Sequence, residues 1–429
     1  MDLADRSRQP WDMKPFWTFR LVACALLSIA PVQAAFRAGI AVRVITPTPL
    51  LPVSGGMGPT SPANEKRGEL TVRALVFEND GVRVGIVSTD LLGFPAVLGN
   101  RVRAAVKGIP ADHLLIGATH THSAPDAYAF PDGKGGTTAD LAYLDLVVAR
   151  AAEAVNEAVD RLQPASLKVA SGEARGKIAY NYYAPDLYDP RAGVLQAVGT
   201  DGRPIATLVN YAIHPEVIGS GRGICSPDLV GPLCDRIAQA GGGTGIFMNG
   251  AQGGMITADN RRPDGEVNTW EECIRIGTLL ADESLRLVND APAQPDPRLR
   301  VAVREVKFPV ESPALIAVLK ASPLGYSTDP EGRVTTRVNW VELGDARILT
   351  IPGEALPNIG YYLKRKLGGE HALLFGLTND AFGYILTAVD WGSFKRYEYI
   401  SRTSLGEQTG EIFMREALAL ADEGLRHRK

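Results

Sequence analysis

Four runs of apolar residues each lead into side chains that can bind a metal. Two of the runs end near histidines, one ends near a glutamate, and one ends near a tyrosine. Neutral imidazole nitrogens and a carboxylate are typical ligands of a catalytic zinc ion, which keeps one position open for water. The ion lowers the pKa of that water from about 15.7 to about 7 and polarises a substrate carbonyl. The runs and side chains are 114–118 with His120 and His122, 205–211 with His214, 347–351 with Glu354, and 372–377 with Tyr384.

These spacings leave a structural role open for each residue. A His-x-His pair in an extended chain places both rings on one side, but many such pairs bind nothing, so both roles stay open for His120 and His122. His214 stands before a proline, Glu354 follows Pro-Gly where a predicted helix starts, and Tyr384 by itself is typical of a core residue. Two histidines and one carboxylate also occur in non-haem iron oxygenases, so that class stays open as well.

Short apolar runs alternate with longer amphipathic segments along the chain, which is typical of an α/β protein. In open α/β sheets the carboxyl ends of the strands form the ligand crevice. We therefore expect mixed or mostly parallel sheets flanked by helices, with the metal site at strand carboxyl ends. The predicted strands are 72–78, 82–89, 114–118, 205–211, 245–249, 338–343, 347–351 and 372–377. The predicted helices are 139–162, 229–239, 271–289, 355–367 and 410–425.

The composition is that of a globular protein without a nucleic-acid partner. Of the 429 residues, 45% are hydrophobic and 22% are charged, and the formal net charge is −3. The only dense basic run, residues 426–429, lies at the terminus, so no nucleic-acid-binding surface is indicated. The proline-rich segment 290–298 is interpreted as a connector that could divide the chain into two lobes.

The first 34 residues have the layout of a signal peptide. Basic residues occur up to Arg20, an apolar run covers residues 21–32, and Val32-Gln33-Ala34 has the small-x-small pattern of a cleavage site. The run is too short for a membrane span. The sequence thus predicts an exported protein, periplasmic or secreted, whose mature chain (35–429) has no stable span. Three cysteines of this chain, Cys225, Cys234 and Cys273, permit one disulfide and one buried thiol.

Several of these motifs resemble the catalytic domain of the neutral (non-lysosomal) ceramidase family. Residues 117–125 (GATHTHSAP) resemble that family's THTHSGP segment, and residues 210–215 resemble its second histidine segment. Residues 351–354 (IPGE) resemble its PGE segment, and residues 379–387 (NDAFGYILT) its tyrosine-containing NxYxxYVT segment. The similarity extends from about residue 39 to about residue 399, which indicates a ceramidase-like catalytic domain over residues 35–429.

The resemblance implies a zinc site and an activity. It places His122 close to the metal as a proton shuttle or as a hydrogen-bond partner of a ligand, and Tyr397 in the wall of the substrate pocket. The implied activity is hydrolysis of an amide or ester bond in an N-acyl lipid or related small molecule, with metal-bound water as the nucleophile. The implied zinc ligands are His120, His214, Glu354 and Tyr384.

The chain also departs from the family's pattern. Ceramidases carry a serine in a GDVSPN-like loop, and the corresponding residues 247–257 read FMNGAQGGMIT. Gly254 then replaces the aspartate and Ile256 the serine, with Thr257 next to it. These changes leave open a catalytically decayed protein that binds a lipid or glycan. Because the chain ends near the end of the family's catalytic domain, we expect no C-terminal β-sandwich domain.

Overall fold

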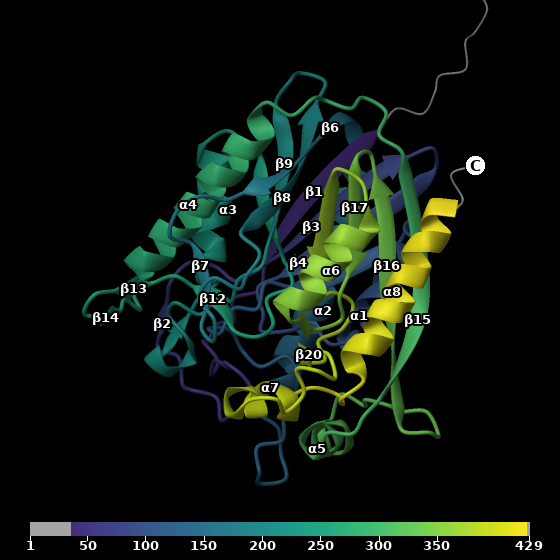
Figure 1. Ribbon diagram of the computed structural model, residues 1–429. Coiled ribbons are helices and arrows are strands. Elements are labelled where there is room, and N and C mark those ends of the chain that lie inside the picture. Colours follow the sequence, from purple (N-terminus) through teal and green to yellow (C-terminus); the bar gives the residue numbers. More distant parts are fainter. Residues whose placement is uncertain (1–35, 427–429) are drawn as a thin grey trace, which may run out of the picture. The chain divides into compact units, whose positions relative to one another are not determined.

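A large mixed sheet forms the centre of the protein (Figure 1). The computed structural model describes residues 36–426, so the predicted signal peptide, residues 1–34, lies outside the described residues. The strands pair in parallel at both ends of the strand order, and antiparallel between them. In order across the sheet, the strands are β11 (Thr244–Asn249), β9 (Pro204–Tyr211), β8 (Arg191–Gly199), β6 (Gln163–Glu173), β1 (Arg37–Val44), β3 (Thr71–Asn79), β4 (Val82–Thr89) and β5 (Leu114–Ala118).

A second, smaller sheet packs against the first. Its neighbouring strands pair antiparallel except for β17 and β19, which pair in parallel. Buried apolar side chains of both sheets, among them Leu208 and Ile246 of the large sheet and Val341 and Ile348 of the small one, share one core. In order, the strands are β15 (Leu299–Pro309), β16 (Arg333–Leu343), β17 (Ala346–Thr350) and β19 (His371–Phe375).

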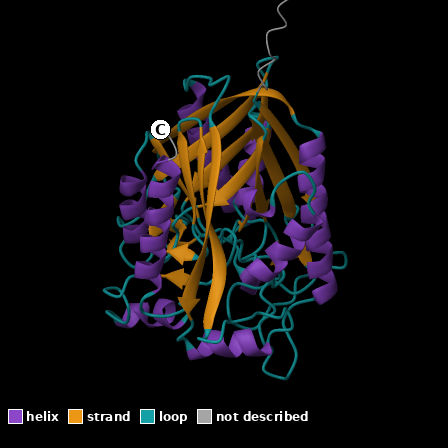
Figure 2. Ribbon diagram, turned by 90° about the vertical axis from the view of Figure 1, so that its right-hand side faces the viewer, coloured by secondary structure: helices purple, strands orange, loops and turns teal. Residues whose placement is uncertain are grey.

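Helices cover the outer faces of the two sheets, so the protein has four layers (Figure 2). Strand β3 illustrates how both faces of the large sheet are covered. Its Val72 and Val76 pack against helix α2, whereas its Leu75 and Phe77 pack toward the small sheet. The two pairs point in opposite directions because successive side chains of a strand point to opposite faces. The helices on the large sheet are α1 (Ala96–Ala105), α2 (Leu141–Asp160), α3 (Val230–Gln239) and α4 (Trp270–Asn289). Those on the small sheet are α6 (Pro357–Leu367) and α8 (Thr409–Arg426).

Short elements lie where the two sheets end. Helices α5 (Pro313–Ala321) and α7 (Glu398–Arg402) lie at the same end of the protein in Figure 1. The paired short strands are β18 (Glu354–Ala355) with β20 (Tyr384–Ile385), β12 (Ile256–Ala258) with β7 (Ala179–Asn181), β10 (Ile224–Cys225) with β2 (Glu65–Lys66), and β13 (Arg261–Arg262) with β14 (Gly265–Glu266).

The α/β architecture with helix-flanked sheets is confirmed, and of the two sheet types expected the mixed one is present. Within residues 36–426, no helix is both long and apolar enough to span a bilayer. The disulfide that the sequence permitted is absent, since Cys225, Cys234 and Cys273 are all free and buried. Burial raises the pKa of Cys225 to about 12 and that of Cys234 to about 11, so both remain thiols.

Candidate metal centre

Two histidines are brought together by the ends of strands that are distant in the sequence. His120 follows the carboxyl end of β5, and His214 follows the carboxyl end of β9. Asn249, the last residue of β11, is fully buried between them. Its Nδ2 donates to the carbonyl of Thr119, at 3.0 Å, and to that of Ile213, at 2.7 Å, the residues directly before the two histidines. Asn249 therefore fixes the spacing of the two histidine-bearing loops.

Backbone carbonyls set the orientation of both rings. Nδ1 of His120 lies 2.5 Å from the carbonyl oxygen of Leu92, and Nδ1 of His214 lies 2.8 Å from that of Ile256. Each Nδ1 donates its proton, so the neutral form of each ring carries its lone pair on Nε2. The two Nε2 atoms lie 3.5 Å and 3.2 Å from Oε2 of Glu354.

This donor set fits a bound cation. When both rings are neutral, two nitrogen lone pairs face an anionic oxygen of Glu354 with no proton between them, and such an arrangement is repulsive. Oε2 of Glu354 is buried and, among the described residues, has no hydrogen-bond donor while His214 is neutral. A divalent cation between His120, His214 and Glu354 removes the repulsion, and imidazole with carboxylate is a donor set that zinc takes.

The negative charges around His214 favour a proton on its ring. Burial disfavours a charged ring at His214, but the hydrogen bond to Glu354 and the charges of Glu216 and Glu354 outweigh it and raise the pKa of His214 to about 9. Burial lowers the pKa of His120, and burial together with the neighbouring rings holds the pKa of His122 well below its usual range. Burial also acts to raise the pKa of Glu354, but His120 and His214 outweigh it and lower that pKa.

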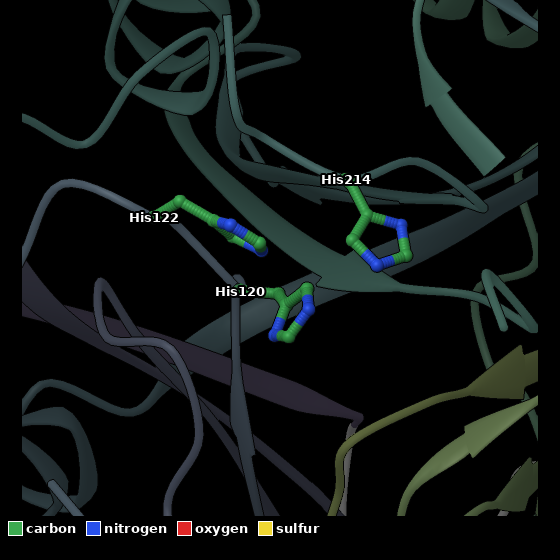
Figure 3. Close-up of side chains that lie close together, drawn as sticks. All are labelled: His120, His122 and His214. Carbon is green, nitrogen blue, oxygen red and sulfur yellow. The ribbon is translucent and has the colours of Figure 1, made fainter. Parts of the chain in front are cut away.

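His122 is the third ring of the cluster (Figure 3). Its possible ligand atom and those of His120 and His214 all lie within 4.8 Å of one another. Nδ1 of His122 lies 3.4 Å from Oε2 of Glu216. Its Nε2 is buried and, within residues 36–426, has no hydrogen-bond partner. The ring is thus positioned either to bind the metal as a further ligand or to carry a proton beside it.

Tyr384 lies next to Glu354 through a pair of short strands. β18 and β20 pair in parallel, with Glu354 and Tyr384 directly opposite each other. The hydroxyl of Tyr384 donates to Sδ of Met255 at 3.2 Å. Burial, followed by the charge of Glu354, keeps the pKa of Tyr384 well above its usual value. The hydroxyl is thus directed at a thioether, and ligation of the metal by Tyr384 stays a prediction.

A cavity of about 200 Å³ opens beside the rings. His120, His122, Glu354, Tyr384 and Tyr399 form one part of its wall. The rest is mainly apolar and includes Val97, Phe130, Leu315, Val318, Leu319 and Leu405. The arrangement combines a polar, metal-competent end with an apolar space.

Two solved structures share this architecture. The neutral ceramidase from Pseudomonas aeruginosa matches with a TM-score of 0.76 and 17% sequence identity, over 92% of this chain and 75% of that chain. The chain has the neutral ceramidase fold. A ceramidase complexed with C2 matches with a TM-score of 0.75 and 18% identity, over 92% of this chain and 76% of that chain. Neither a family model nor a curated protein matches the sequence.

The neutral ceramidase fold agrees with the fold that the sequence motifs predicted. The likeness concerns the fold, so the assigned zinc ligands and the absence of a C-terminal β-sandwich domain stay predictions. Of the residues predicted for the site, the structure brings His120, His122, His214, Glu354 and Tyr384 together.

Tyr397, the sixth predicted site residue, does not line the cavity. Its ring contacts Tyr183 and Phe394, with centroids 5.4 Å apart in each pair. Tyr399 occupies the wall position instead and contacts the ring of Tyr384 at 6.0 Å. The two residues lie at the start of α7, and side chains two positions apart on a helix point in nearly opposite directions. This two-residue difference could not be decided from the sequence.

The residues at the serine position of the ceramidase loop face away from the cavity. Ile256 is fully buried, and its carbonyl accepts hydrogen bonds from the backbone N–H and the ring of His214. Thr257 lines a separate hollow of about 270 Å³, together with Glu216 and Met255. This loop therefore supports the metal centre through its backbone.

Sequence reasoning missed two residues that complete the centre. Glu216 contacts His122, and Asn249 joins the loops of His120 and His214. The segment His214-Pro215-Glu216 places a carboxylate two residues after a candidate ligand, which is a signal that could have identified Glu216. Asn249 ends a predicted strand, but an asparagine at that place has no distinctive pattern.

Proposed function

We propose that this protein is a zinc-dependent hydrolase of amide bonds, with ester bonds as secondary substrates, and that it acts on N-acyl lipids or related molecules. The observation that carries the proposal is the pair of Nε2 atoms, from His120 and His214, directed at a buried oxygen of Glu354 in the wall of an apolar cavity. The likeness in fold to a neutral ceramidase supports the same class of substrate.

The metal, held by His120, His214 and Glu354, would supply a Lewis acid that activates water and polarises the substrate carbonyl. His122 is positioned to move protons, because its Nε2 is unpaired and its ring forms part of the cavity wall. It takes a proton from the attacking water and returns it to the leaving amine. Glu216, whose Oε2 lies 3.4 Å from Nδ1 of the same ring, is placed to orient His122 and to favour its charged form during proton transfer.

The apolar part of the cavity fits an acyl chain. Val318 and Leu405 are buried in its wall, and Leu315 and Leu319 line it as well. A chain attached to the reacting carbonyl would extend from the polar end into this space. Each buried methylene contributes about 0.8 kcal/mol, so kcat/KM is expected to rise with acyl-chain length until the cavity is filled.

The apparent zinc affinity is expected to increase as the pH rises. Burial opposes a charge on His214, but Glu354 and Glu216 raise its pKa from 6.5 to about 9 in the metal-free protein. The proton on His214 therefore stabilises the folded, zinc-free protein relative to the unfolded chain. This stabilisation is complete below pH 6.5 and is lost as the pH rises through 9. Zinc must displace the proton, so affinity should rise about tenfold per pH unit between about pH 6 and about pH 8. Competition with a chromophoric chelator measures it, and a pH-independent affinity would contradict this account.

Replacing Asn249 by alanine is expected to weaken zinc binding by about 10- to 100-fold, the usual cost of losing a partner that orients ligands. The reason is that, among residues 36–426, Asn249 is the one side chain that donates to the carbonyls before both His120 and His214. Asn210→Ala is the matched control, because Asn210 is equally buried and its Nδ2 donates to three carbonyls, none of which precedes a histidine of the site. Isothermal titration of zinc into both variants measures the effect, and equal affinities would argue against it.

A substrate panel tests the proposed function. The panel holds the acyl chain constant and varies the bond between an amide and an ester, each with zinc-loaded and chelator-treated protein. We expect zinc-dependent hydrolysis of the amide, lost on chelation and restored by zinc. Binding of the acyl compounds without turnover would instead support a decayed lipid-binding protein, and iron-dependent oxygen consumption would support an oxygenase.

We also propose that the protein is exported, on the basis of the layout of residues 1–34. Mass spectrometry of the exported protein should show a mature N-terminus near Ala35. Recovery of the exported protein with Met1 intact would refute cleavage at this position.

A further inference from the structure

Helix α5, which lies beside the cavity, is composed almost entirely of apolar residues. Its sequence, Pro313–Ala321 (PALIAVLKA), contains one charged residue, Lys320. Val318 is the one buried residue of this helix, and Leu315, Ile316 and Leu319 are half-buried. A surface helix of a globular protein normally turns a polar face to water. Helix α5 has no such face.

A second group of exposed apolar and aromatic side chains lies on the segment that leads into α7. Val389 is 82% exposed, Phe394 is 63% exposed and Tyr399 is 41% exposed. The ring of Phe394 contacts Tyr397, which contacts Tyr183, with 5.4 Å between the centroids in each pair. Phe394, Tyr397 and Tyr183 therefore form one continuous group of rings.

The two groups border the same cavity. Leu315, Val318 and Leu319 of α5 line it, and Tyr399 of α7 lines it as well. Figure 1 shows both helices at one end of the protein. We call this surface the cavity rim and define it as α5 together with residues 389–399. Leu315, Val318, Leu319 and Tyr399 thus belong both to the rim and to the wall of the cavity.

Basic side chains accompany the aromatic ones. Lys320, Lys395, Arg396 and Arg402 are all exposed on or next to the rim. Three acidic residues lie among them, Glu398 and the half-exposed Asp390 within the rim and the exposed Glu311 two residues before α5, which leaves an excess of one positive charge. Aromatic rings with polar edges are enriched at the bilayer–water interface, and lysine and arginine are attracted to anionic headgroups. Both features favour a lipid surface over water.

We propose that the cavity rim docks on the surface of a phospholipid bilayer, with Val389, Phe394 and the exposed side of α5 inserted among the headgroups. The cavity then opens toward the acyl chains, and a lipid reaches it without its chain crossing water. Binding of this kind is interfacial, since α5 is far too short to span a bilayer. It requires no turnover, so it is measured separately from hydrolysis.

Co-sedimentation with vesicles tests the proposal, using phosphatidylcholine with and without phosphatidylglycerol. We expect the metal-free protein to bind, more strongly to the anionic vesicles, and the double variant Val389→Ser/Phe394→Ser to bind at least about tenfold more weakly, as expected from the loss of two inserted apolar groups. Val44→Ser/Ile274→Ser is the matched control, because these residues are 52% and 43% exposed and lie on β1 and α4, which are not part of the rim. This control variant should bind as the wild type does.

Trp391 provides a second, local readout. It lies within the rim and is partly exposed. Brominated lipids should quench its fluorescence, and Trp391→Phe should remove that quenching while the protein still binds. Wild-type protein that stays in the supernatant with both vesicle types would overturn the proposal. So would equal losses in both double variants, or a lipid-free dimer that Phe394→Ser dissociates, which would identify the rim as an interface between two copies.

Discussion

Replacing His214 by alanine is expected to give a folded protein that no longer binds zinc. The variant loses one of the two Nε2 donors that face Oε2 of Glu354. Zinc sites of about four ligands bind with an apparent 10–16 kcal/mol in total, so one ligand corresponds to a loss of roughly a hundredfold or more in affinity. His120→Ala should behave in the same way, since its ring is the other donor.

The measurement is elemental analysis of the purified variants, with circular dichroism to check the fold. His371→Ala is the control, because His371 bonds to Ser171 at the edge of the small sheet and takes no part in the cluster. It should retain one equivalent of zinc. Full zinc content in His214→Ala or His120→Ala would show that the ligands are wrongly assigned.

Replacing His122 by alanine is expected to lower kcat by about 10²- to 10⁴-fold, the usual contribution of a general acid or base, while zinc is retained. The unpaired Nε2 of His122 in the cavity wall is the atom that would carry the proton. Glu216→Gln should lower kcat less, because the glutamine still occupies the position beside Nδ1 but cannot stabilise a charged ring. Single-turnover kinetics with parallel zinc analysis measure both.

Thr257→Ala is the matched control for this series. Thr257 follows the position of the family's serine but lines a different hollow from the cavity beside His120 and His122. Its removal should leave kcat within about threefold, as for a substitution outside the site. A trapped acyl group on Thr257, or loss of all activity in the variant with zinc retained, would show that this hydroxyl is the nucleophile. Loss of zinc from His122→Ala would instead make His122 a ligand.

The strands that carry the site could be predicted because they are buried on both faces. Residues 82–89 and 114–118 form β4 and β5 with the predicted bounds, and both are nearly continuous apolar runs. The edge strand β15 was not predicted, since its sequence LRVAVREVKFP alternates apolar with charged residues and is half-exposed. Strand β6 was missed for a related reason, because Pro164, Lys168 and Gly172 interrupt its apolar pattern.

The side chains of the site could be predicted from the sequence more readily than the groups that orient them. His120, His214 and Glu354 each follow a buried strand, so their meeting at one place was foreseeable. The groups that orient them are the backbone carbonyls of Leu92 and Ile256. A carbonyl is common to every residue, so the sequence cannot mark it, and these partners depend on how distant loops pack. The same holds for the contact of Glu216 with His122.

The most direct test of the proposed function is a titration of zinc into chelator-treated protein while hydrolysis of an N-acyl amine is followed. The three groups His120, His214 and Glu354 form one centre, so the rate should rise in proportion to added zinc and reach a plateau at one equivalent per chain. Full turnover by the zinc-free protein would contradict the account, and so would one tightly bound equivalent of zinc with no hydrolysis of any acyl amide or ester.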